Sequence, residues 1–123
     1  LTGACAVLAA TGFRGRQSVV GIDLGTTYSV IGVNEAGRVH IIKGSNGDPL
    51  IPSVVSFLDG GGVAVGRDAV ALLDSEPENT IYGAKRFIGR KFSDEAVSEE
   101  AAEHHFSLVH QPEDISGAWF SIK

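Results

Sequence analysis

Methionine is absent from this chain of 123 residues, and cysteine occurs once, as Cys5. A single thiol excludes a disulfide framework within the chain, and it neither requires nor excludes an oxidising compartment. Basic residues are also few: ten Lys and Arg stand against fifteen Asp and Glu, which gives a net charge of −5. This balance argues against nucleic acid as a partner, because a nucleic-acid-binding surface needs a basic face.

No apolar run is long enough to span a bilayer, which takes about 20 residues. The nearest candidate, at 1–13, is small, apolar and uncharged. Its residues Ala4 and Ala6 have the spacing found before a signal-peptide cleavage site, so we expect 1–17 to be a signal or anchor remnant followed by a linker. A disordered leader or a wrongly joined exon is the alternative. Since the chain does not begin with Met, we expect a processed or truncated N-terminus.

Beyond this segment the pattern changes to short β-branched runs separated by turns. The runs at 18–22, 28–33 and 38–42 predict three strands of an antiparallel meander. The segment 43–52 is rich in turn-forming residues and predicts a loop, after which 54–57 and 63–66 predict a hairpin.

Helical signals follow the hairpin. We predict a short helix at 68–73, a second at 80–88 with Asn79 as its N-cap, and a third at 94–103 capped by Ser93. The fold class is therefore α/β, with an N-terminal antiparallel meander followed by short strands and helices.

The last part of the chain predicts two more strands, at 106–110 and 118–122. We expect Trp119 to pack on the second of them. The four histidines show no metal-binding spacing, and His104 and His105 are placed to contact the last carbonyls of the preceding helix.

The loop between the first two predicted strands contains Asp23, Gly25, Thr26 and Thr27. Gly25 would adopt a backbone conformation closed to other residues and let a ligand approach the main chain. Successive N–H groups and two threonine hydroxyls could then form one anion-binding concavity. Asp23 would hold water around Mg²⁺, which prefers oxygen ligands and keeps much of its hydration. On these residues alone, a plain hairpin turn is the more frequent explanation.

The longer string changes this interpretation. Residues 21–29, Gly-Ile-Asp-Leu-Gly-Thr-Thr-Tyr-Ser, resemble the N-terminal phosphate motif of Hsp70 chaperones, which belong to the actin and sugar-kinase superfamily. Residues 51–57, Ile-Pro-Ser-Val-Val-Ser-Phe, resemble a strand of that family. Residues 79–90, Asn-Thr-Ile-Tyr-Gly-Ala-Lys-Arg-Phe-Ile-Gly-Arg, resemble its lysine-bearing helix. Three motifs in order extend the resemblance over roughly 18–92.

The resemblance implies a partial actin-like, ribonuclease H-like ATPase lobe that binds ATP or ADP together with Mg²⁺. It implies that the phosphates contact the loop residues Gly25, Thr26, Thr27 and Tyr28. Asp23 would then organise the metal through water, and Lys85 would be the catalytic lysine at the γ-phosphate. Positioning and a nearby cation perform most of the catalysis in phosphoryl transfer.

From spacing alone, Lys85 and Arg86 are interpreted as solvent-exposed charges on a helix. Only the resemblance to the family motif changes that interpretation, and it does so for Lys85. Arg86 keeps an interdomain or solvated role. The family has Asp where this chain has Gly83. We expect that glycine to loosen the placement of Lys85, because glycine inside a helix costs about 1 kcal/mol relative to alanine.

Short runs, Ile51-Pro52-Ser53 among them, favour the microsomal stress-70-like chaperone ATPase core within the family. Together with the apolar 1–13 segment they imply a stress-response chaperone of the endoplasmic reticulum or microsomes, with the cytoplasm as the alternative.

The family's ATP site lies between two lobes, so 18–123 is expected to be an incomplete N-terminal part of its nucleotide-binding domain. The second phosphate loop and the peptide-binding domain would fall beyond residue 123. Unfolded client polypeptides and co-chaperones are implied partners of the full-length protein. We expect this chain alone to bind ATP weakly and to hydrolyse it inefficiently. A truncated non-enzymatic product or an interaction module is the alternative, and a sugar kinase is disfavoured by the run at 84–89.

Overall fold

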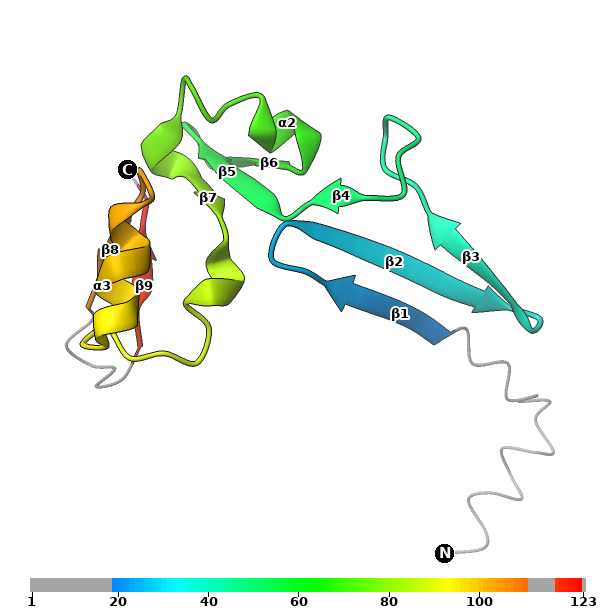
Figure 1. The fold of residues 1–123 in the computed structure, drawn as a ribbon. Helices are drawn as coiled ribbons and strands as arrows, with labels where there is room; N and C mark the ends of the chain where they lie inside the picture. Colours follow the sequence, from blue (N-terminus) through cyan, green and yellow to red (C-terminus); the bar gives the residue numbers. More distant parts are fainter. Residues whose placement is uncertain (1–18, 111–116, 123) are drawn as a thin grey trace, which may run out of the picture.

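The computed structural model of the chain describes residues 19–110 and 117–122. The expectations for 1–17 lie outside the described residues, as does most of the turn expected before the last strand. Within the described ranges the strands form three antiparallel sheets with short helices between them (Figure 1). The α/β class and the N-terminal antiparallel meander are therefore confirmed.

The first sheet contains four strands: β1 (Val19–Leu24), β2 (Tyr28–Glu35), β3 (Arg38–Ile42) and β4 (Ile51–Pro52). The three long strands form the meander that the alternating β-branched residues predict. β4 corrects the expectation that the whole segment 43–52 is loop. Its two residues pair with the start of β2, where Tyr28 lies opposite Pro52. Proline can take this place because the strand is short and lies at a sheet edge.

A two-residue turn joins β2 to β3. Ala36 and Gly37 both have positive φ angles, of 51° and 84°. Two successive residues with positive φ match the right-handed twist of a hairpin, which is why tight hairpin turns favour Asn and Gly there. The side-chain carbonyl of Asn34 accepts a hydrogen bond of 3.1 Å from the N–H of Gly37. Alanine in the first turn position is therefore under backbone strain.

The second sheet has the order β6–β5–β7, with bounds β5 (Val54–Leu58), β6 (Gly62–Val65) and β7 (Thr80–Tyr82). The predicted hairpin at 54–66 is confirmed. The predicted helix at 80–88 is wrong, since Thr80 to Tyr82 form a strand along β5. The buried hydroxyls of Ser56 and Thr80 are hydrogen-bonded at 2.9 Å across that pair. A β-branched and aromatic run is better suited to a strand than to a helix, and this preference prevails.

Short helical turns surround the second sheet: α2 (Arg67–Val70), η1 (Pro77–Asn79) and η2 (Ala84–Arg86). α2 is shorter than the predicted helix at 68–73. Asn79 is the last residue of η1 and precedes a strand, so its predicted role as a helix N-cap is also wrong.

The third region consists of α3 (Glu95–Ala102), β8 (Ser107–Val109) and β9 (Trp119–Ser121). β8 and β9 pair as predicted. The N-cap of α3 is Asp94 rather than Ser93, and the Asp94 carboxylate accepts a 2.9 Å hydrogen bond from the N–H of Lys91. Trp119 is 43% exposed, so the expectation that it packs is wrong.

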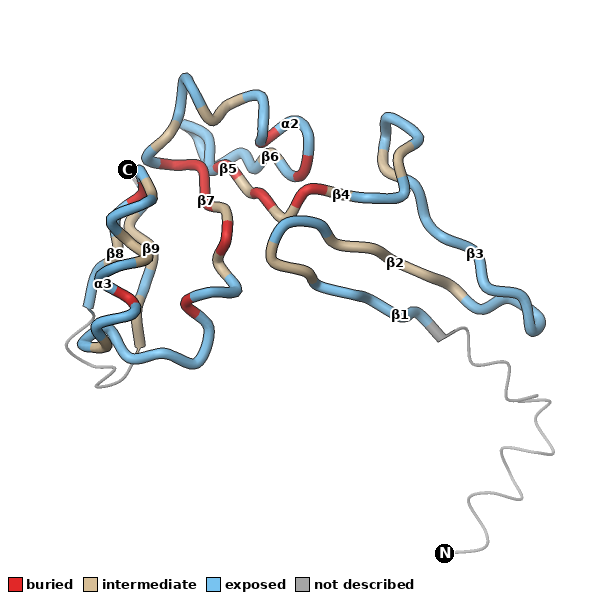
Figure 2. The backbone as a smooth tube through the Cα atoms, viewed as in Figure 1, coloured by how far each residue is buried: buried red, intermediate tan, exposed pale blue. Residues whose placement is uncertain are grey.

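The hydrophobic core lies between β7, α3 and the β8–β9 pair, as the buried segments in Figure 2 show. It consists of Ile81, Phe87, Val97 and Phe106, with partly buried neighbours around them. Phe87 contacts Phe106 and Phe120 edge to face, with ring centroids 6.0 Å and 5.9 Å apart. This geometry is the preferred one for aromatic pairs, and it anchors the segment that follows η2.

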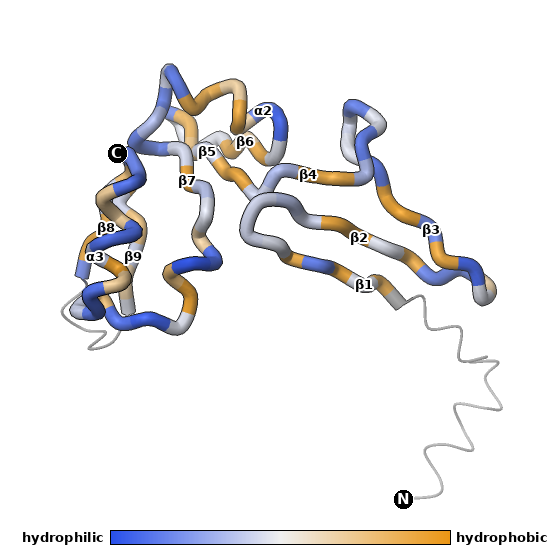
Figure 3. Tube along the Cα trace, in the orientation of Figure 1, coloured by the Kyte–Doolittle hydropathy of each residue, from blue (hydrophilic) through white to orange (hydrophobic). Residues whose placement is uncertain are grey.

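The first sheet is apolar but largely uncovered by the described part of the chain (Figures 2 and 3). Ile22 is 64% exposed and Val39 is 70% exposed. The two residues lie on opposite faces, because Ile22 pairs with Ile31 whereas Val39 pairs with Asn34. Among the described residues, no helix is both long and apolar enough to cross a membrane.

Candidate phosphate-binding site

The loop at 25–27, between β1 and β2, is tightly closed around Gly25. A Cβ atom at this position would lie 2.2 Å from the carbonyl oxygen of Tyr28, which is main chain and therefore has little room to yield. Gly25 is not among the residues with positive φ, so its expected special backbone angle is not observed. Glycine is required here by the close approach of two main-chain segments.

Ser53, the residue between β4 and β5, holds this loop. Its hydroxyl donates a 2.8 Å hydrogen bond to the carbonyl of Gly25, and its N–H donates one of 2.9 Å to the carbonyl of Thr27. Ser29 Oγ lies 2.8 Å from Ser53 Oγ. Because the single Ser53 hydroxyl hydrogen is directed to Gly25, Ser29 must be the donor in that contact. Ser29 of β2 and Ser53, between β4 and β5, thus connect these strands to the loop.

Lys85 reaches the same loop from a segment 61 positions away in sequence. Its Nζ donates a hydrogen bond of 2.5 Å to the carbonyl of Leu24, the residue before Gly25. In Figure 1 the β1–β2 loop faces the segment between β7 and α3, from which Lys85 projects. The structure therefore brings together the phosphate-loop motif, the Pro-Ser motif and the lysine motif.

The turn that carries Lys85 differs from the predicted helix. Gly83 has φ 63° and ψ 14°, a left-handed conformation, and η2 follows it. The N–H of Arg86 then bonds the carbonyl of Gly83 at 2.9 Å. The expectation that Gly83 weakens a helix interior is wrong, because no helix passes through it. Glycine suits this position, since the left-handed region strains other L residues.

Arg86 is also better defined than the sequence indicates. Its guanidinium forms an ion pair of 3.1 Å with Glu100 of α3. His104, which follows the end of that helix, contacts the Glu100 carbonyl through Nδ1 at 2.8 Å, as the sequence predicts for a histidine at a helix end. The segment around Lys85 is thereby attached to α3.

A groove of about 460 Å³ begins at the loop and runs toward α3. Thr26, Thr27 and Ser53 line one end of it, whereas Arg86, Glu100 and His104 line the other. The two loop threonines thus face a space large enough for a ligand. In the described part of the chain, no turn or loop hydrogen bond uses the N–H groups of Gly25, Thr26 or Thr27 as donors.

The remaining predicted site residues lie at the strand ends beside the loop. Asp23 is exposed on β1, opposite Val30, and Tyr28 begins β2 with 47% of its surface exposed. The described residues contain no group of three or more His, Cys, Asp or Glu side chains that could hold a metal ion directly. Asp23 offers one exposed carboxylate, the kind of oxygen ligand that Mg²⁺ prefers.

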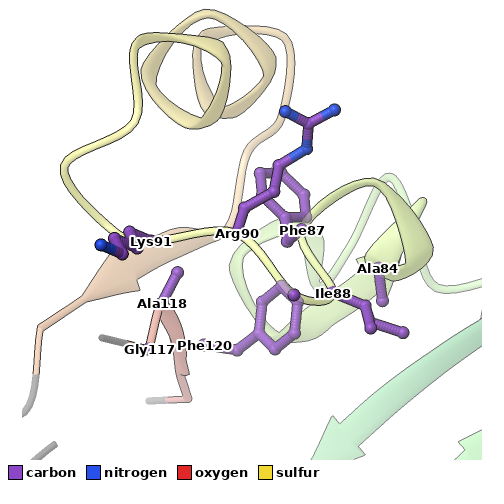
Figure 4. A pocket seen from close by; sticks show the side chains of 9 residues that line it. Ala84, Phe87, Ile88, Arg90, Lys91, Gly117, Ala118 and Phe120 are labelled. Carbon is purple, nitrogen blue, oxygen red and sulfur yellow. The ribbon is translucent and has the colours of Figure 1, made fainter. Parts of the chain in front are cut away.

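Two other features lie away from this site. A hollow of about 470 Å³ is lined by Ala84, Phe87, Ile88 and Phe120, among others, but by no residue of the β1–β2 loop (Figure 4). The second feature is the carboxylate of Asp48, which accepts a 3.0 Å hydrogen bond from the N–H of Leu50 and pairs with Arg67. The Leu50 hydrogen bond, followed by the Arg67 guanidinium, lowers the pKa of Asp48 below its ordinary value.

Sequence reasoning missed the two serines. In the sequence, Ser53 appears only as part of a strand motif and Ser29 only as the last residue of the loop motif. The available signal was the small hydroxyl residue directly after Pro52, where a strand end can direct a side chain onto a neighbouring turn.

Comparison with known proteins agrees with this geometry. A family profile described as Hsp70 protein matches residues 19–122. Heat shock 70 kDa protein 13 of Mus musculus is 48% identical over 95 residues, and the human protein of the same name is 47% identical. Each alignment covers 76% of this chain and 20% of the relative, so the chain spans about a fifth of the length of these relatives. The chain belongs to the Hsp70 family, and its fold is that of a partial actin-like ATPase lobe.

Proposed function

We propose that this chain supplies one side of a Mg–ATP site: the first phosphate-binding loop and the lysine that contacts the γ-phosphate. The observation that carries the proposal is the contact between Lys85 Nζ and the carbonyl of Leu24 at the start of that loop. A cation held at a glycine loop, with threonine hydroxyls beside it, has the chemistry needed to bind phosphate oxygens.

The loop supplies the donors. The N–H groups of Gly25, Thr26 and Thr27 are unused by other turn or loop bonds in the described residues, and Thr26 and Thr27 line the groove. Gly25 lets the Tyr28 carbonyl approach the main chain of the loop, which sets the shape of the turn that a phosphate would meet. Tyr28 adds a side chain at the edge of the same turn. Ser53 supports this arrangement by holding the carbonyls of Gly25 and Thr27 on the opposite side of the turn.

Lys85 supplies the positive charge of the proposed site. In the structure its ammonium group donates to a neutral carbonyl, which is a weaker acceptor than a phosphate oxygen. A γ-phosphate at the loop would compete for the same donor and place the positive charge where negative charge develops during transfer. In this role Lys85 also orients the attacking water.

Asp23 is the proposed metal-side residue. It lies two positions before Gly25 on β1, and its carboxylate is exposed. When bound, Mg²⁺ would neutralise phosphate charge, and Asp23 would hold its coordinated water rather than bind the ion alone.

The proposed site is one-sided. For the full-length protein we propose ATP hydrolysis as the activity, with unfolded client polypeptides and co-chaperones as partners. For the 123-residue chain we propose weak Mg–ATP binding and inefficient turnover, because the groove leaves the ligand's other face open to water.

Titration of Mg–ATP into the 123-residue chain, followed by ³¹P NMR, tests this proposal. Lys85→Met should weaken the affinity about tenfold, the scale of a lost hydrogen bond to a charged group. Lys43→Met is the matched control, since Lys43 is an exposed lysine of the β3–β4 loop and should leave the affinity unchanged. Equal affinity for the Lys85→Met variant and the original chain would refute the proposal, as would equal binding with and without Mg²⁺.

Delivery to the endoplasmic reticulum or microsomes is a separate proposal, based on the composition of 1–13. Fusing these residues and the linker to a fluorescent protein should direct it to microsomal membranes, and a purely cytoplasmic signal would contradict this.

A further inference from the structure

The space beside Gly83 is filled by a side chain from the residues that follow α3. A Cβ atom at position 83 would lie 3.1 Å from Nε2 of His104. His104 has only 5% of its side chain exposed, although it follows the end of a surface helix. The imidazole thus occupies the place that a side chain at position 83 would take.

His104 contacts the residues on both sides of the Lys85 turn. Its ring stacks on Tyr82, with centroids 4.6 Å apart and an interplanar angle of 29°. It also meets Phe87 edge to face, with centroids 5.6 Å apart. Tyr82 directly precedes the turn and Phe87 directly follows η2. One ring therefore spans the base of the turn from which Lys85 projects.

The orientation of this ring is fixed by the preceding helix, α3. The Glu100 carbonyl can only accept a hydrogen bond, so Nδ1 of His104 is the donor in their 2.8 Å contact. Nε2 is then directed toward Gly83. The Glu100 side chain meanwhile pairs with Arg86, the residue after Lys85. α3 and the residues that follow it thus contact the turn through a ring and through an ion pair.

We propose that His104 is a positioning residue for Lys85: its imidazole replaces a side chain at position 83 and holds the turn that directs Lys85 to the phosphate loop. The role rests on the proposed function of Lys85, because positioning matters for phosphate binding only if Lys85 contacts phosphate. The contact itself can be tested without nucleotide, so the two proposals can fail separately.

Acetylation of lysines in the 123-residue chain by an N-hydroxysuccinimide ester, quantified by mass spectrometry, measures the placement of Lys85. The rate at Lys85 is divided by the rate at Lys43, so that differences in reagent concentration cancel. His104→Leu keeps apolar bulk but removes the flat ring and the Nδ1 donor. We expect this variant to raise the Lys85 ratio about fivefold, the scale of one lost aromatic contact.

Two further variants distinguish positioning from general stability. His104→Phe keeps a flat ring against Tyr82 and should return the Lys85 ratio most of the way to its original value. His105→Leu changes the exposed neighbour of His104 and should leave the ratio unchanged. A ratio raised equally by His104→Leu and His105→Leu would overturn the proposal.

Gly83→Ala tests the same contact from its other side. The added methyl group would meet Nε2 at 3.1 Å and would require a left-handed alanine, so it should also raise the Lys85 ratio. The proposal is overturned if the Lys85 ratio is unchanged in a His104→Leu or Gly83→Ala variant that still folds. Loss of the fold in both would overturn it too, because His104 would then serve the whole chain rather than the Lys85 turn.

Mg–ATP binding connects the inference to function. If both proposals hold, His104→Leu weakens Mg–ATP binding and His104→Phe restores it. If the variant raises the Lys85 ratio but leaves the Mg–ATP affinity unchanged, the result supports the positioning of Lys85 by His104 and refutes its role in phosphate binding.

Discussion

The hydroxyl of Ser53 donates a 2.8 Å hydrogen bond to the carbonyl of Gly25, across 28 positions of sequence. This bond connects the residue between β4 and β5 to the proposed phosphate loop. Lys85 contacts the preceding carbonyl, that of Leu24, so two consecutive carbonyls of the loop are held by distant side chains.

Replacing Ser53 by Ala should loosen the loop without disrupting the sheets. The variant loses the bond to Gly25 and the contact with Ser29, and we expect the free energy of unfolding to fall by about 1 kcal/mol. Thermal unfolding followed by circular dichroism measures this change. Ser53→Thr retains the hydroxyl and should recover most of the loss, whereas Ser107→Ala, at an exposed position of β8, should cost little. Equal destabilisation by Ser53→Ala and Ser107→Ala would contradict the role of Ser53.

Gly25→Ala should impair the loop more severely than Ser53→Ala. Since the new Cβ would lie 2.2 Å from the Tyr28 carbonyl oxygen, the main chain must shift. We expect Mg–ATP affinity to fall at least about tenfold, which corresponds to about 1.4 kcal/mol. Gly21→Ala is the control, because its Cβ would meet nothing closer than 3.9 Å. The prediction fails if the two alanine variants bind Mg–ATP equally well by ³¹P NMR.

Ala36→Asn should stabilise the chain. Ala36 has φ 51°, a left-handed conformation that costs an ordinary L residue about 1 kcal/mol and that Asn tolerates better. We therefore expect a higher midpoint of thermal unfolding. Ala71→Asn, at a residue with φ −64°, should bring no such gain. A lower midpoint for Ala36→Asn would show that the turn is not strained in solution.

Asp48 should contribute to acid sensitivity. Hydrogen bonding by Leu50 and Arg67 lowers its pKa in the folded chain below the ordinary value of 3.8. The stabilisation is therefore fully present above pH 3.8 and is lost as the pH falls through the lowered pKa. Asp48→Asn should be less stable than the original chain at neutral pH, and the difference should shrink in acid. Urea unfolding at several pH values checks this, and a difference that grows in acid would have the wrong sign.

Sequence patterns predicted the antiparallel strands well, because alternating β-branched residues and turn residues are local signals. They failed at 80–88, where a strand is selected by pairing with β5 and by the buried Ser56–Thr80 contact. Neither contact is visible in a local window. The same error led to a wrong account of Gly83, which ends a strand in a left-handed turn rather than interrupting a helix.

The candidate site was predicted only in part. The loop and Lys85 were identified through family resemblance, and the structure brings them together. Of their supports, Ser53 lies 28 positions from Gly25 and His104 lies 22 positions from Tyr82. Such partners depend on the folded arrangement of β4 and α3, which residue spacing does not specify.

The most direct test of the Mg–ATP site is an amide chemical-shift map of the 123-residue chain during titration with Mg–ATP. We predict that the largest saturable shifts occur at Gly25, Thr26 and Thr27, with a smaller shift at Lys85. Amides around the hollow of Figure 4, such as Ile88 and Phe120, should change little. Saturable shifts centred on that hollow, or none at the loop, would contradict the claim that this chain supplies the first phosphate-binding loop of the ATP site.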